Sequence, residues 1–68
     1  MIGKLAKQFG FELKLEVLQS GAGFYIGTFD YNPSDYGPFS RESEEYFSSK
    51  EEAQQALDNN TWTQRTSA

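Results

Sequence analysis

Residues 9–29, FGFELKLEVLQSGAGFYIGTF, decide the fold that this sequence predicts. From Phe9 to Val17, apolar side chains alternate with glycine or charged residues, and this period of two is typical of a half-buried strand. The two glycines within residues 20–23 then indicate a turn. Residues 24–29 are rich in aromatic and β-branched side chains, so we expect a second strand that pairs antiparallel with the first.

A third strand is expected in the middle of the chain. Residues 30–38 are dense in turn-forming residues, among them Pro33, Gly37 and Pro38. After this reversal, residues 42–47 are predicted to return along the sheet. The glutamates at the outer positions of this segment weaken its strand pattern.

A helix is predicted over residues 48–57. Ser49 and Glu52 have the spacing of a capping box, in which each side chain satisfies a backbone N–H near the helix start. Residues 59–60 are both asparagine, which tolerates the left-handed conformation that ends a helix. The apolar stripe that should face the sheet consists of Ala53, Ala56 and Leu57.

These elements predict one α+β domain over residues 1–68, with an antiparallel sheet of three strands and one helix packed on one face, in the order β-β-β-α. Residues 61–65 either add a fourth strand or form a tail whose Trp62 folds back onto the core. Residues 1–8 are expected to be a loose arm or one helical turn, and residues 66–68 to be frayed. The predicted core consists of Phe11, Leu13, Leu15, Val17, Phe24, Ile26, Phe47, Ala53, Ala56, Leu57 and Trp62.

The composition excludes several kinds of chemistry. The 68 residues include no cysteine and no histidine, which removes disulfides, the usual zinc sites, thiol catalysis and Ser-His triads. We therefore expect a protein that is not an enzyme, with no catalytic residue, cofactor or metal. No segment has the pattern of a secretory signal or a membrane span, so a cytoplasmic location without membrane binding is expected.

Two loops partly match ligand-binding motifs. The glycines of residues 21–23 precede a strand rather than a helix, so they indicate a hairpin turn and not a dinucleotide loop. Asp30, Asn32 and Ser34 have the spacing of a calcium loop, but Asp35 and Arg41 stand where that loop needs Gly and Glu. A polar turn is the better interpretation.

Acidic residues are concentrated in the second half of the chain, and eight of the eleven aromatic residues lie between Phe24 and Phe47. Residues 30–58 hold eight acidic and two basic residues within a protein of net charge −4. These acids form either a solvated face or a negative surface that meets a basic partner. The aromatic side chains have three interpretations: core packing, a protein contact, or stacking of nucleic-acid bases. The negative charge of residues 30–58 repels phosphate groups and so opposes the third interpretation.

Residues 40–53, SRESEEYFSSKEEA, resemble a pattern in small bacterial and phage proteins of uncharacterised function. In those proteins a strand ends in Tyr-Phe, a Ser or Thr caps a helix, and Glu-Glu-Ala opens it; residues 23–27 are similar to the same plan. In size and charge, the chain is also similar to small acidic phage-encoded inhibitors of the anti-CRISPR type. That likeness implies a protein that occupies a basic, nucleic-acid-binding surface of a host protein.

We therefore expect a small acidic module that binds a protein with a basic surface, with phage or mobile-element inhibition as the narrower hypothesis. The alternatives are a nucleic-acid-binding module that uses sheet aromatics, and a structural domain completed by homodimerisation. Arg41 is either a recognition residue or a partner of a neighbouring glutamate. The predicted binding residues are Glu42, Glu44, Glu45, Glu51, Glu52, Tyr31, Tyr36, Tyr46 and Arg41.

Overall fold

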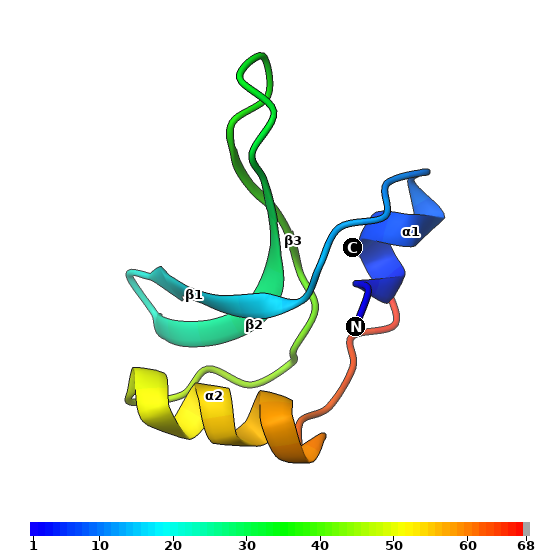
Figure 1. The fold of residues 1–68 in the computed structure, drawn as a ribbon. Coiled ribbons are helices and arrows are strands. Elements are labelled where there is room, and N and C mark those ends of the chain that lie inside the picture. The colour runs from blue at the N-terminus through cyan, green and yellow to red at the C-terminus, as the bar shows by residue number, and fades with distance from the viewer. Residues whose placement is uncertain (68) are drawn as a thin grey trace.

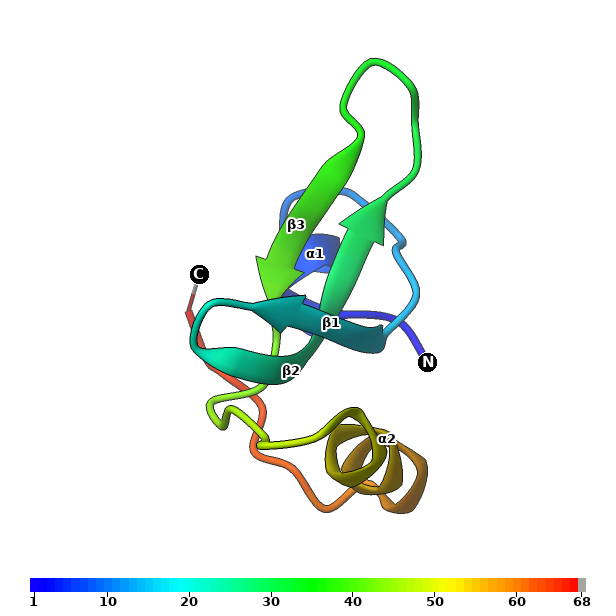
Figure 2. The same cartoon turned by 90° about the vertical axis from the view of Figure 1, so that its left-hand side faces the viewer.

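The sheet consists of two antiparallel hairpins that share their middle strand (Figure 1). The computed structural model describes residues 1–67. Its strands are β1 (Glu16–Ser20), β2 (Gly23–Asp30) and β3 (Gly37–Arg41), and its helices are α1 (Lys4–Gln8) and α2 (Lys50–Asn59). Helix α2 lies along the β1–β2 hairpin, whereas the β2–β3 hairpin projects away from it and α1 lies beside β3 (Figures 1 and 2). The predicted α+β class and the order of strands and final helix are confirmed.

The β1–β2 hairpin forms where the two glycines indicated a turn. Ser20 pairs with Gly23, which leaves a loop of two residues, and Val17 pairs with Ile26 further along. The Ser20 hydroxyl accepts a hydrogen bond from the Ala22 N–H at 3.2 Å and thereby holds the loop. The predicted turn and antiparallel pairing are therefore confirmed.

The first strand begins at Glu16, so the predicted start at Phe9 is wrong. Gly10 has a φ of 87° and ends α1, with its N–H donating to the Lys7 carbonyl and the Phe11 N–H donating to the Ala6 carbonyl. This pair of bonds is the Schellman arrangement, which favours glycine because the left-handed conformation is strained for other residues. Gly10 therefore terminates a helix and is not part of the first strand.

The third strand is β3, so the predicted strand over residues 42–47 is also wrong. That segment continues along β2 without a regular ladder, since the N–H groups of Glu42 and Ser43 both donate to the Ile26 carbonyl. Further along, the segment pairs with β2 again at an isolated bridge between Phe24 and Phe47.

Helix α2 spans Lys50–Asn59 rather than the predicted residues 48–57, but it has the predicted N-cap and ends at the predicted asparagines. Ser49 is the N-cap, and its hydroxyl accepts a hydrogen bond from the Glu52 N–H at 3.1 Å. The Glu52 carboxylate accepts from the Ser48 hydroxyl, so only half of the predicted capping box is formed. At the other end, Asn60 is left-handed with a φ of 55°. Within residues 1–67, neither helix is long and apolar enough to cross a membrane.

The main core lies between α2 and the β1–β2 hairpin. Its buried residues are Leu15, Ile26 and Ala56, and Trp62 packs against them. The folded-back tail predicted for Trp62 is therefore confirmed, and residues 61–65 contribute one isolated bridge rather than a strand.

A second buried region lies under α1. Leu5 and Ala6 are buried, so residues 1–8 are not a loose arm but contain the helical turn that was the alternative. Phe11 is 43% exposed, and its predicted place in the core is wrong. Of the tail expected to be frayed, Thr66 and Ser67 are exposed, and Ala68 lies outside the described residues.

Candidate functional site

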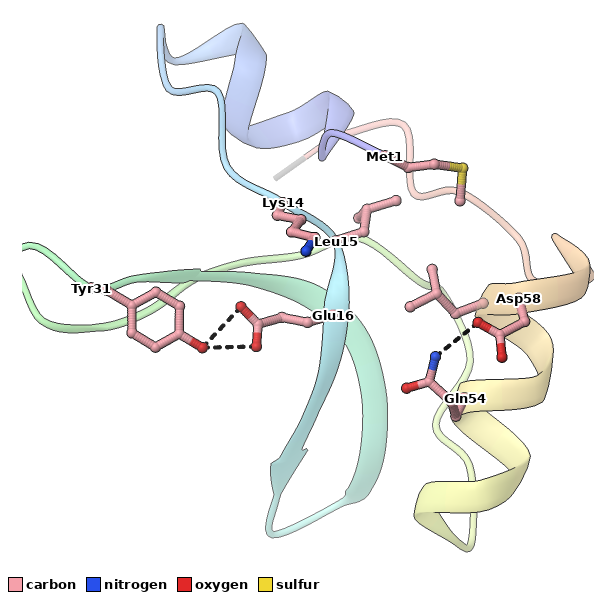
Figure 3. Close-up of a pocket in the computed structure, with 8 residues that line it drawn as sticks. Met1, Lys14, Leu15, Glu16, Tyr31, Gln54 and Asp58 are labelled. Atoms are coloured by element: carbon pink, nitrogen blue, oxygen red, sulfur yellow. Dashed lines mark hydrogen bonds between the residues drawn. The ribbon is translucent and has the colours of Figure 1, made fainter.

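A groove of about 700 Å³ lies between the start of β1 and the second half of α2 (Figure 3). It is a candidate because its lining combines an apolar floor with charged groups at the rim. The lining residues are Met1, Lys14, Leu15, Glu16, Tyr31, Gln54, Leu57 and Asp58.

One side of the groove is held by Tyr31 and Glu16. Tyr31 follows β2, and its hydroxyl lies 2.8 and 3.0 Å from the two carboxylate oxygens of Glu16 in β1. The hydrogen bond to Glu16 raises the pKa of the Tyr31 phenol above its ordinary value, so the phenol stays protonated and donates. This hydrogen bond uses one lone pair of the Glu16 carboxylate, which can accept several hydrogen bonds.

The other side of the groove belongs to α2. Gln54 and Asp58 stand one turn apart, and the Gln54 amide donates to the Asp58 carboxylate at 2.9 Å. Figure 3 shows this pair on the opposite side of β1 from Tyr31 and Glu16. The second oxygen of the Asp58 carboxylate gives the groove further acceptor capacity.

The floor and the charge of the groove define what it can bind. Leu15 is 8% exposed and belongs to the core, while Leu57 is half-buried beside it. Two carboxylates, of Glu16 and Asp58, stand against the single cationic side chain of Lys14. An aliphatic surface flanked by two carboxylates suits a lysine or arginine side chain, whose stem is apolar and whose end is cationic.

The hairpin beside the groove carries a group of exposed aromatic rings. Phe29 lies 4.6 Å from Tyr31 and 4.9 Å from Tyr36, measured between ring centroids. Tyr31 is 61% and Tyr36 is 68% exposed, so the two predicted tyrosines do lie at the surface. Rigid aromatic side chains with a polar end are frequent anchors in protein interfaces.

Glu42 does not belong to any binding surface, and its predicted role there is wrong. Its side chain is fully buried, and its carboxylate accepts hydrogen bonds from the backbone N–H groups of Leu5 and Ala6 at 3.0 and 3.1 Å. It also accepts from the Ser40 hydroxyl at 2.6 Å and the Gln64 amide at 2.8 Å. Glu42 therefore caps the N-terminus of α1, a helix with no side-chain cap of its own.

The remaining predicted glutamates lie in two parts of the fold: Glu44 and Glu45 follow β3, and Glu51 and Glu52 belong to α2. Glu44 is exposed, while both oxygens of Glu45 lie 3.0 Å from the Thr63 N–H. Burial raises the pKa of Glu45, but hydrogen bonding to Thr63 outweighs burial and the pKa is lowered. Glu51 and Glu52 are exposed in the first turn of α2, where they complement the helix dipole.

Arg41 pairs with an aromatic residue rather than with a glutamate. Its guanidinium lies 4.8 Å from the ring centroid of Tyr46 and donates to the Tyr46 hydroxyl. Tyr46 is 41% exposed and packs edge-on against Tyr25 of β2. Arg41 and Tyr46 thus form a cation–π pair on the sheet.

The nine predicted residues therefore do not form one continuous surface. The β2–β3 hairpin, whose loop contains Tyr31 and Tyr36, projects away from α2, whose first turn contains Glu51 and Glu52 (Figure 1). The sequence hypothesis missed Glu16 and Asp58, which join Tyr31 in one groove only through the pairing of β1 with β2 and the packing of α2.

Comparisons with protein-family models, with curated proteins and with solved structures found no match for the chain. The resemblance to small bacterial and phage proteins therefore stays a prediction. The function is inferred from the chain's own residues.

Proposed function

We propose that the protein is a non-enzymatic module that binds a basic segment of another protein in the groove between β1 and α2. The observation that carries the proposal is the lining of the groove, where the carboxylates of Glu16 and Asp58 flank an apolar floor of Leu15 and Leu57. A lysine or arginine stem would cover the leucines while its cationic end meets a carboxylate.

The surroundings of the groove support the same kind of partner. The exposed rings of Tyr31 and Tyr36 extend the contact area along the hairpin. The net charge of −4 attracts basic proteins over distance, with an association rate that falls as salt rises. Basic surfaces that bind nucleic acid are partners of this chemistry, and blocking one of them is the narrower form of the proposal.

The test uses a fluorescein-labelled peptide in which three lysines are separated by leucine and glycine. Fluorescence anisotropy measures its affinity for the full chain and for Glu16→Gln and Asp58→Asn, which remove one charge each and keep one acceptor oxygen. Each substitution should weaken binding roughly two- to fivefold at low salt. Lys14→Gln removes the cationic side chain from the lining, so it should strengthen binding by a similar factor.

Glu12→Gln is the matched control, because Glu12 is exposed and lies outside the groove. It changes the net charge by the same amount and should leave the affinity unchanged. Equal weakening by Glu12→Gln and Glu16→Gln would show attraction to the whole protein rather than binding in the groove. Tighter binding of a labelled single-stranded oligonucleotide than of the peptide would favour the nucleic-acid alternative.

A further inference from the structure

A second cavity, of about 350 Å³, lies between α1 and β3. Leu5 and Phe9 line it from α1 and the end of that helix, and Phe39 and Ser40 line it from β3. It shares no lining residue with the groove between β1 and α2. What this cavity binds is therefore a separate question from the proposed function.

Three exposed phenylalanines surround the cavity or adjoin it. Phe9, Phe11 and Phe39 are 59%, 43% and 36% exposed. The Phe39 ring lies 4.8 Å from that of Phe11 and 6.3 Å from that of Phe9, between centroids. Isolated exposed apolar residues need no explanation, but a contiguous aromatic group on a small protein marks an interaction surface.

The lining of the cavity includes two cationic residues although the protein is acidic. Both arginines of the sequence, Arg41 and Arg65, line it, and no carboxylate does. The nearby Glu42 is fully buried behind Ser40 and accepts its hydrogen bonds from inside the fold. An anionic ligand would therefore meet guanidinium groups without facing an exposed acid in the lining.

Arg65 is the arginine positioned for a ligand. Its Nη1 donates to the Arg41 carbonyl at 3.0 Å, which fixes the guanidinium beside β3. The Arg41 guanidinium is already engaged with the ring and the hydroxyl of Tyr46. A guanidinium held by one bond keeps further N–H groups in the fork that matches a carboxylate.

We propose that this cavity binds an acidic peptide segment, with one large apolar side chain among Leu5, Phe9 and Phe39 and a neighbouring carboxylate on Arg65. Charge complementarity selects an anionic partner, and the apolar lining selects one with an aromatic or aliphatic anchor. A nucleic acid is disfavoured, because its affinity comes from several phosphate contacts at once and the protein carries a net charge of −4.

The probe is a fluorescein-labelled heptapeptide with a central tryptophan and three acidic residues on each side. Two-dimensional amide NMR of the full chain should show shifts concentrated at Leu5, Phe9, Phe39 and Arg65. Replacing the central tryptophan by alanine should weaken binding more than roughly tenfold. Phe9→Ser and Arg65→Gln should each weaken it roughly five- to tenfold.

Lys50→Gln is the control for charge, because Lys50 is exposed on α2 and lies outside the cavity. It should leave the peptide affinity unchanged. Shifts centred on other residues, or no binding at millimolar peptide, would overturn the proposal whatever the variants do. Stronger binding of a ten-nucleotide thymidine strand at the same amides would overturn it in favour of a nucleic-acid site.

Discussion

Glu42 provides the sharpest test of the structure, because four donors from three separate segments meet on its buried carboxylate. Leu5 and Gln64 donate to one oxygen, while Ala6 and Ser40 donate to the other. Glu42→Gln keeps the size and shape of the side chain but offers only one acceptor oxygen. The substitution therefore changes the hydrogen bonding and the charge without leaving a cavity.

The expected loss of stability follows from the hydrogen bonds that Glu42→Gln removes. The Ser40 hydroxyl can turn to accept from the new amide, but one backbone N–H of α1 is left facing an NH₂ group. A buried unpaired donor costs about 1–3 kcal/mol, and the remaining bonds lose their charge assistance. Because a neutral amide is cheaper to desolvate, part of this loss is offset, and we expect a net destabilisation of about 2–4 kcal/mol. In a domain of this size that lowers the Tm by roughly 8–30 °C.

The effect should depend on pH. Burial raises the pKa of Glu42, but the hydrogen bonds from Leu5, Ser40, Gln64 and Ala6 together outweigh it and hold the pKa below its ordinary value. A carboxylate whose pKa is lower in the folded state stabilises the fold above its unfolded pKa, about 4.3, and loses that contribution as the pH falls through the folded value. The difference between wild type and Glu42→Gln should be full at pH 7 and shrink below about pH 4.

Thermal unfolding followed by circular dichroism, repeated from neutral to acidic pH, measures both effects. Glu45→Gln is the matched control, since Glu45 is half-buried and its carboxylate accepts from Thr63 rather than from α1. We expect it to cost less than about 1 kcal/mol. Equal stabilities of wild type and Glu42→Gln at pH 7 would refute the role of ionised Glu42 as the cap of α1. A difference in stability that does not vary with pH would refute it as well.

Three further substitutions test the packing. Ser49→Ala removes the N-cap of α2 and should cost about 1 kcal/mol, which thermal melting detects as a fall of roughly 4–8 °C. Gly27→Ala places a Cβ against the Ser40 carbonyl and 2.9 Å from the Tyr25 ring, so urea unfolding should show a loss of roughly 1–3 kcal/mol, whereas Gly21→Ala, with open space around it, should show far less. Leu57→Ala should cost about 1–3 kcal/mol in the same assay because Leu57 is half-buried against the core; an unchanged midpoint would place it in solvent.

The elements that the sequence predicted correctly are those determined by interactions between residues close together in the chain. Helix α2 begins directly after Ser49 and ends before Asn60 because both signals act within one turn of the helix. The β1–β2 hairpin is equally local, since its loop contains only Gly21 and Ala22.

The strand prediction for residues 9–17 was wrong because this alternating segment contains both the C-cap of α1 and the start of β1. Gly10 terminates α1, and Phe9 and Phe11 then pack on Phe39 instead of entering the sheet core. A glycine just after a short helical segment is a termination signal, and it was present in the sequence.

The candidate sites depend on contacts between distant residues. Nothing near Glu42 distinguishes it from the exposed Glu44, because its burial depends on Leu5, which lies 37 residues away. Likewise, Tyr31 meets Glu16 across 15 residues of chain. Local patterns assign such acids to the surface, and only the tertiary fold separates the structural carboxylate from those available to a partner.

The wide spacing of the groups around Glu42 also sets an order of events during folding. Its carboxylate joins Leu5 and Gln64 across 37 and 22 residues, so closing those loops costs more chain entropy than forming the β1–β2 hairpin or α2. We expect α1 to dock after the rate-limiting step, with a φ-value near zero at Glu42. Weakening this cap should then leave the refolding rate nearly unchanged and accelerate unfolding, so that Glu42 governs how long the native state persists once it has formed.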